Sequence, residues 1–169
     1  MKNKSSYIIA IVAFLVLECF GMDTWSAITT AASVGVFWDF LYEKWLWRLN
    51  PKIPKVYGNY VSMNWSSYNG GKDYQTNIEI SQTASKIIVK ETMGNSTCDS
   101  LSAELVKMTG NQDWYLFYSY ITNPDAASGD TMHLGTAYLR VNGRNELVGS
   151  YYTNRTQQTN GTMKLTRVK

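Results

Sequence analysis

Histidine and cysteine are scarce in this chain of 169 residues. His133 is the only histidine and no Cys-x-x-Cys pair occurs, so a zinc site or a histidine-based catalytic triad has too few residues to form. The two cysteines are Cys19, inside an apolar run, and Cys98, near an expected turn. This pattern does not indicate a disulfide framework, and it fits a reducing compartment.

Charged residues and prolines are also few. Asp, Glu, Lys and Arg make up 17% of the chain, the formal net charge is +3, and there are three prolines. So small a net charge does not indicate binding to a nucleic-acid polymer. Aromatic residues make up 14% of the chain. Many aromatic residues with few charges are typical of a folded, β-rich body rather than a disordered one.

Residues 1–49 are predicted to form a two-helix transmembrane hairpin. An unbroken apolar run covers residues 7–17, and a second stretch, 25–41, is apolar or small except at Asp39. Positive charge before an apolar run is also typical of a signal peptide, but the second stretch and the lack of a small-x-small cleavage site favour membrane helices. Both stretches are short against the roughly 20 residues that a spanning helix needs, a mismatch that thinning or oligomerisation can relieve.

Charges at the two ends of this hairpin predict its orientation. Lys2 and Lys4 precede the first stretch, and Arg48 and Lys52 follow the second. The positive-inside rule therefore places both termini in the cytoplasm, as for a multi-pass membrane protein. Aromatic residues near the end of the second stretch are expected to form an interfacial belt, consisting of Phe37, Trp38, Phe40, Tyr42, Trp45 and Trp47.

Small residues recur along the second stretch. Ala27, Ala31 and Gly35 are spaced four residues apart. Small side chains at this spacing let two helix backbones approach closely. The pattern predicts helix association through this face.

The rest of the chain, residues 56–169, is predicted to be one all-β domain after a linker, residues 50–55, that contains Pro51 and Pro54. Eight strand-like segments follow one another, mostly through short turns such as Asn142-Gly143. The segments are 56–67, 74–83, 86–92, 100–108, 114–122, 132–141, 146–155 and 162–168. We expect a membrane-anchored, eight-stranded antiparallel up-and-down β-barrel, because closure removes the exposed edges.

An eight-stranded barrel is either filled by side chains or holds one small ligand. The residues expected to point inward are aromatic and polar rather than mainly aliphatic, and they include Tyr118, Tyr120, Tyr138, Tyr152, Thr136 and Ser102. A barrel with a purely structural interior would favour aliphatic residues more heavily. This composition favours a ligand.

The closing hairpin, which pairs residues 149–155 with 161–167, carries further candidates. By the two-residue period, Tyr151 and Thr153 share one strand face with Arg155. Arginine and tyrosine on one face suit a planar or anionic ligand, since guanidinium binds phosphate and rings stack on bases. The alternative is a surface arginine beside core tyrosines. The candidate ligand-binding residues, from both strand faces, are Tyr118, Tyr120, Tyr138, Tyr151, Tyr152, Thr153, Asn154 and Arg155; no catalytic residue, metal ligand or cofactor is predicted.

The order and spacing of several fragments resemble the SMODS-associating two-transmembrane, β-strand-rich effector family of bacterial CBASS anti-phage defence. Besides the two apolar stretches, the matching fragments are Trp45-Leu46-Trp47 with Pro51 and Pro54, Gly58-Asn59-Tyr60, residues 66–71, residues 78–82, and residues 149–155 with Gly161. The resemblance covers nearly the whole chain. One departure is Tyr60, where the family pattern has tryptophan, a change that a core aromatic position should tolerate.

The resemblance implies a receptor rather than an enzyme. The barrel is expected to bind a cyclic dinucleotide made by a partner nucleotidyltransferase during infection. Binding is expected to drive oligomerisation through the transmembrane segments, and disruption of the lipid bilayer of the inner membrane then leads to abortive infection.

Two other functional classes stay open. One is a membrane-anchored, lipocalin-like carrier of a small molecule, which would retain a hydrophobic ligand on purification. The other is an enzyme, for which no pairing of a base with a nucleophile is evident around His133.

Overall fold

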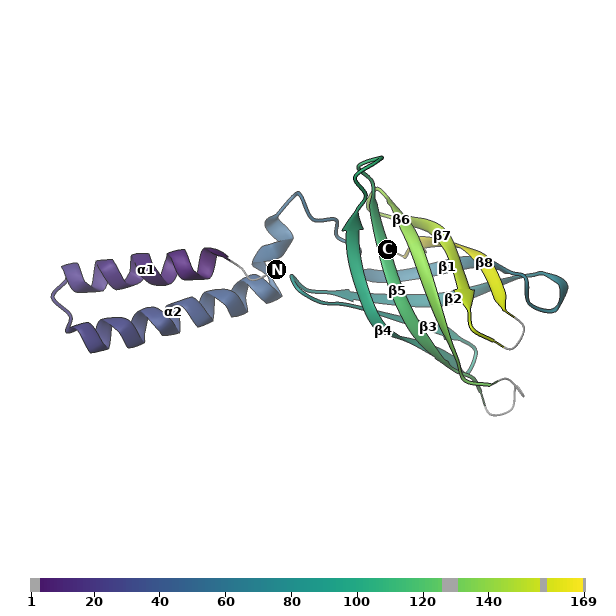
Figure 1. The fold of residues 1–169 in the computed structure, drawn as a ribbon, viewed down its shortest axis with the longest axis horizontal. Coiled ribbons are helices and arrows are strands. Elements are labelled where there is room, and N and C mark those ends of the chain that lie inside the picture. The colour runs from purple at the N-terminus through teal and green to yellow at the C-terminus, as the bar shows by residue number, and fades with distance from the viewer. Residues whose placement is uncertain (1–3, 126–130, 156–157, 169) are drawn as a thin grey trace. The chain divides into compact units, whose positions relative to one another are not determined.

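The computed structural model describes residues 4–125, 131–155 and 158–168, with the side chains of Lys4 and Asn69 left out. Lys2, one of the predicted flanking charges, lies outside these residues. The chain divides into two compact units (Figure 1). A helical unit comprises residues 1–53 with 83–85, and a β unit comprises residues 54–82 with 86–169.

The helical unit is an antiparallel pair of helices. Helix α1 spans Lys4–Cys19, helix α2 spans Thr24–Lys44, and a short 3₁₀ helix, η1, spans Leu46–Leu49. Asp23 caps α2, because its Oδ1 accepts a hydrogen bond from the backbone N–H of Ser26 at 3.1 Å.

The small residues of α2 lie on its buried face. Ala27, Ala31 and Gly35 are buried, and a Cβ atom placed on Gly35 would lie 3.2 Å from Cβ of Ala10 on α1. The close helix approach predicted from this spacing therefore occurs between two helices of the same chain.

The predicted transmembrane hairpin is not supported. Among the described residues, no helix is both long and apolar enough to cross a membrane. Helix α1 has only 16 residues, against the roughly 20 that spanning requires. Helix α2 has 21 residues, but hydroxyl side chains are spread along it and Asp39, Glu43 and Lys44 lie in its C-terminal part. The predicted membrane anchor and the multi-pass inner-membrane location with cytoplasmic termini are wrong on this finding.

The β unit is a closed barrel of eight antiparallel strands in sequential order (Figure 1). The strands are β1 Gly58–Ser66, β2 Lys72–Gln82, β3 Ile87–Met93, β4 Ser96–Lys107, β5 Trp114–Asn123, β6 His133–Asn142, β7 Glu146–Thr153 and β8 Thr159–Arg167. Pairing of β1 with β8 closes the ring, so the predicted up-and-down barrel is confirmed.

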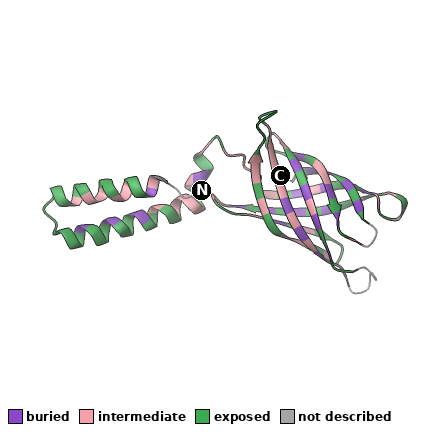
Figure 2. Cartoon of the chain, viewed as in Figure 1, coloured by how far each residue is buried: buried purple, intermediate pink, exposed green. Residues whose placement is uncertain are grey.

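Alternation of buried and exposed residues along each strand fixes which side chains face inward (Figure 2). The interior away from the β1–β2 loop is apolar, and its members include Ile78, Ile80, Val89, Leu116, Leu139, Leu147 and Leu165. A bulge in β4, between Ser100 and Ser102, inserts the exposed Leu101 and shifts the inward phase, so that Cys98 faces inward before it and Ala103 and Leu105 after it. The other end of the interior is polar and hollow.

Candidate functional site

A cavity of about 450 Å³ opens inside the barrel at the end where β1 joins β2 and β7 joins β8. Its wall is formed by residues of β2, β3, β4, β5 and β7, and its mouth by Tyr68, Lys72, His133, Arg155 and Thr159. The volume lies within the range of roughly 300–1,000 Å³ that is usual for small-ligand sites.

Three tyrosines form the aromatic part of the wall. Tyr74, Tyr120 and Tyr151 line the cavity, and the hydroxyl of Tyr74 donates a hydrogen bond to the hydroxyl of Tyr151 at 3.0 Å. Burial raises the pKa of Tyr74 and of Tyr120 above the usual range. Both hydroxyls therefore keep their protons at neutral pH; the Tyr74 proton is donated to Tyr151, and the Tyr120 hydroxyl can donate a hydrogen bond to a ligand.

Glycines on neighbouring strands make room for two of these rings. Gly135 pairs with Tyr120 across β5 and β6, and Gly161 pairs with Tyr151 across β7 and β8. A Cβ atom at Gly135 would overlap the Tyr120 ring, and one at Gly161 would overlap the Tyr151 ring and the backbone of Trp65. Each ring thus covers a glycine of the next strand, an arrangement in which the ring compensates for the side chain that glycine lacks.

Arg155 lies at the cavity mouth, where it contacts Tyr68 and His133. Its guanidinium carbon is 4.5 Å from the centre of the Tyr68 ring, a cation–π distance. Its Nε–H donates a hydrogen bond to Nε2 of His133 at 3.2 Å. With Nε2 as the acceptor, the proton of the ring lies on Nδ1, which donates to the carbonyl of Thr131 at 2.9 Å. These contacts hold a cation beside a wall of tyrosines.

Glu91 lies further inside, on β3, within a polar network. The amide of Asn64 donates to the hydroxyl of Thr76 at 3.1 Å and reaches Oε1 of Glu91 at 3.5 Å. Asn64 and Thr76 are buried. Burial raises the pKa of Glu91, although a hydrogen bond with Thr76 opposes this shift.

Cys98 of β4 lies opposite Glu91 and also lines the cavity. Its sulfur lies 3.2 Å from the hydroxyl oxygen of Thr122. Burial raises the pKa of the Cys98 thiol to about 11, and Glu91 adds to the shift. The thiol is therefore protonated and unreactive at neutral pH.

Four of the eight predicted ligand-binding residues line this cavity: Tyr120, Tyr151, Thr153 and Arg155. They come from the inward faces of β5 and β7 and from the segment that follows β7. Thr153 is buried, and its hydroxyl pairs with that of Thr159 at 2.6 Å. Tyr118 also points inward, but it belongs to the apolar core and its hydroxyl contacts the sulfur of Met163 at 3.8 Å.

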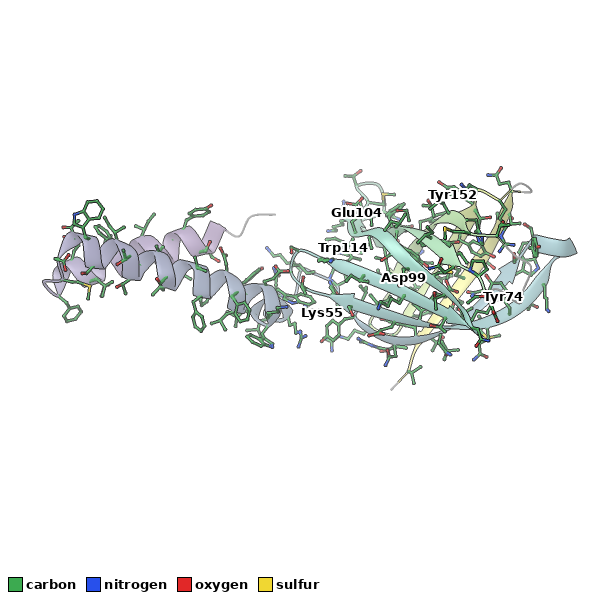
Figure 3. The ribbon with its side chains drawn as sticks, turned by 90° about the horizontal axis from the view of Figure 1, so that it is seen from below. Lys55, Tyr74, Asp99, Glu104, Trp114 and Tyr152 are labelled. Carbon is green, nitrogen blue, oxygen red and sulfur yellow. The ribbon has the colours of Figure 1, made fainter. Side chains whose placement is uncertain are left out.

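The other three predicted residues lie away from the cavity. Tyr138 and Tyr152 are 43% and 49% exposed on the outer face, so the expectation that they point inward is wrong (Tyr152 is labelled in Figure 3). Asn154 is exposed, and its amide oxygen accepts a hydrogen bond from the N–H of Leu134 at 2.8 Å, which extends the pairing of β6 with β7. The two polar residues also expected inside, Thr136 and Ser102, likewise lie on the outer face.

Among the cavity residues that the sequence-based prediction missed are Tyr68, Tyr74, Glu91 and His133. Two had a usable signal. Tyr74 is in phase with the inward Ile78 of β2, and Glu91 is in phase with the inward Val89 of β3. A carboxyl group at an inward position of a strand marks either a network or a ligand. Tyr68 and His133 carried no such signal, because the fold alone brings them to the mouth.

Residues 51–167 match the family model described as the Cap15 cyclic dinucleotide receptor domain. The chain belongs to this family. A relative from Staphylococcus schleiferi, named CD-NTase-associated protein 15, is 26% identical over 187 aligned positions that cover all of both chains. Membership of the Cap15 family supports the resemblance to CBASS effectors seen in the sequence. The two transmembrane helices that this resemblance implied are not confirmed.

Proposed function

We propose that this protein is a CBASS effector whose barrel cavity binds a cyclic dinucleotide. The observation that carries the proposal is the cavity itself, in which Arg155 stands at the mouth of a tyrosine-lined wall. Membership of the Cap15 receptor family supports the same ligand class. The volume of about 450 Å³ is suited to a small, compact ligand.

The chemistry of the lining matches the parts of such a ligand. A cyclic dinucleotide carries two phosphates and two bases. Arg155 and Lys72 supply positive charge at the mouth for the phosphates, and the guanidinium can form paired hydrogen bonds to phosphate oxygens. Tyr74, Tyr120 and Tyr151 supply ring faces and hydroxyl donors for the bases.

The proposed output is self-association, with a nucleotidyltransferase as the source of the ligand. A ligand can promote assembly only if it binds the assembled state more tightly than the single chain. We assign assembly to the helical unit, where Ile8, Val12, Leu15 and Val36 are exposed apolar residues. Loss of the infected cell would follow from assembly, and disruption of the inner membrane stays a prediction.

A lipocalin-like carrier of a hydrophobic ligand is less well matched to this cavity. Two cations and a carboxyl group line it, and their desolvation by an apolar ligand would be costly. We also propose a receptor rather than an enzyme. Each ring nitrogen of His133 already has a hydrogen-bond partner, which suits a positioning role for Arg155.

Arg155→Ala tests this proposal. Loss of a hydrogen bond to a charged group costs about 1.5–3 kcal/mol, so the affinity for cyclic dinucleotides should fall about 10- to 100-fold. Arg155→Lys should restore only part of the affinity, because a point charge lacks the bidentate fork. Calorimetric titration measures the affinity, and a melting curve provides the folding control. Wild-type affinity in Arg155→Ala would place the phosphate site elsewhere.

A further inference from the structure

Glu91 is an acidic residue in the wall of a cavity proposed to take an anionic ligand. It lies on β3 between Ile78 of β2 and Cys98 of β4 in the sheet register. No Lys or Arg within the described parts of the chain forms an ion pair with it. Its hydrogen-bond partners are the neutral Asn64 and Thr76. This carboxyl group therefore has no counter-charge that would explain its place in the wall.

The charges of the cavity are separated by position. Lys72 begins β2 beside the mouth, and Arg155 lies two residues beyond the end of β7 at the same mouth. Glu91 lies further in, among groups that cannot neutralise it. Phosphates are therefore attracted to the mouth and repelled from the inner wall. A cyclic dinucleotide held in this way presents a base, not a phosphate, to Glu91.

A carboxylate can only accept hydrogen bonds, and its two oxygens suit two parallel N–H donors. The Watson–Crick edge of guanine offers two such donors side by side, N1–H and the N2 amino group. The corresponding edge of adenine offers one amino donor beside a lone pair, which faces the second oxygen unfavourably. We propose that Glu91 is the specificity-determining residue of the cavity and that it selects guanine as one base of the ligand.

The surrounding network favours this role over a purely structural one. Asn64 approaches Oε1 through an N–H at 3.5 Å, so this donor orients the carboxyl group without neutralising it. A buried carboxylate without full compensation is costly, and two N–H donors from a base offset that cost. Burial raises the pKa of Glu91, so two N–H donors from a bound base are what would favour its ionised form.

This inference rests on the proposed function, and titration of the full chain with three cyclic dinucleotides, repeated for each linkage type, separates the two. The panel contains two guanines, two adenines, or one of each. Wild type should bind the guanine-containing ligands about 10- to 100-fold more tightly than the diadenine ligand, the discrimination typical of one bidentate base contact. If no ligand of any linkage type binds, both the proposed function and the inference fail. Equal binding of all three, or a preference for the diadenine ligand, overturns the inference alone.

Glu91→Gln provides the decisive variant. Glutamine has one acceptor and one donor, which match the edge of adenine. The ratio of guanine to adenine affinity should therefore fall at least tenfold or reverse, whereas Arg155→Ala should weaken all three ligands alike. Glu79→Gln, an exposed carboxyl on the outer face of β2, controls for the lost charge and should leave the ratio unchanged.

An unchanged ratio in a folded Glu91→Gln protein would overturn the proposal. If this variant does not fold, Glu91→Asp keeps the charge but withdraws the oxygens by one methylene group. It should also lower the guanine preference, and a preference equal to that of wild type would overturn the proposal.

Discussion

Single side chains of opposite charge define the two ends of the cavity. Arg155 is held at the mouth by the ring of Tyr68 and by Nε2 of His133. Glu91 is held inside by neutral partners, Asn64 and Thr76. The sequence predicted Arg155 from its strand phase beside Tyr151, but a carboxyl group inside a site for an anion contradicts simple charge matching. The position of Glu91 is explained if its carboxyl group binds a base of the ligand rather than a phosphate.

The raised pKa of Glu91 makes the stability of the empty protein depend on pH. The folded state holds the Glu91 proton more tightly than the unfolded state, where the pKa is near the ordinary 4.5. Stability from this group is therefore present below that value and is lost as pH rises through the folded-state pKa. Glu91→Gln removes the effect, so its melting temperature should exceed that of wild type at neutral pH.

The measurement is a series of melting curves from about pH 4 to pH 8, because the pH dependence of stability reports a proton that the folded and unfolded states bind differently. The difference between Glu91→Gln and wild type should shrink as pH falls, and Glu79→Gln should show no such trend. A difference that stays constant over this range would mean that Glu91 does not titrate within it.

The structural elements were the most predictable part of the molecule. Alternating patterns and Asn-Gly turns predicted all eight strands to within a few residues, with the largest error, four residues, at the start of β4. Side-chain direction in β6 was less predictable, because the sequence suggests that Tyr138 fills the interior. In the structure the interior positions of β6 hold Gly135, Ala137 and Leu139, and the Tyr120 ring from β5 occupies the space over Gly135.

The positions of the two helices were predicted from the sequence, but their predicted role as membrane-spanning helices was wrong. Helix α2 follows its predicted stretch closely, and its small residues are buried as a close-packing face. Apolar residues over 7–17 suggested a membrane span, yet length and polar content fall short of one. The hydrophobic runs therefore predicted the two helices correctly, but they wrongly indicated that these helices cross a membrane.

Gly135→Ala should disturb the cavity from outside its lining. The new Cβ would overlap the ring of Tyr120 and force it to move, and overpacking of this kind costs about 1–3 kcal/mol. We expect a lower melting temperature and weaker ligand binding. Gly110→Ala is the matched control, because no atom lies within 4 Å of its added Cβ. Equal behaviour of the two variants would show that the Tyr120 ring is free to shift.

Gly35→Leu tests the packing of the helix pair. A Cβ at Gly35 already lies 3.2 Å from that of Ala10, so a larger side chain should separate α1 from α2 at a cost of about 1–3 kcal/mol. Val36→Leu is the control, since Val36 is 71% exposed. Helical circular dichroism on heating reports the difference. Equal melting of both variants would contradict close packing at Gly35.

At the scale of the whole molecule, the site depends on contacts between strands that are distant in sequence. Tyr74 of β2 reaches Tyr151 of β7, and Asn64 of β1 reaches Glu91 of β3. Strand phase predicts which residues point inward, but only the register of the closed barrel decides which of them meet. This is why the sequence identified part of the cavity and missed Tyr74, Glu91 and His133.

The most direct test of the proposed function is calorimetric titration of the full chain with cyclic dinucleotides, repeated with Arg155→Ala. We predict one ligand per barrel in wild type and an affinity about 10- to 100-fold lower in the variant, because one charged hydrogen-bonding partner of the phosphates is lost. The Arg155→Ala protein should retain the barrel's melting transition. No heat of binding for any cyclic dinucleotide, or equal binding by both proteins, would contradict the central claim that this cavity is a cyclic-dinucleotide receptor site.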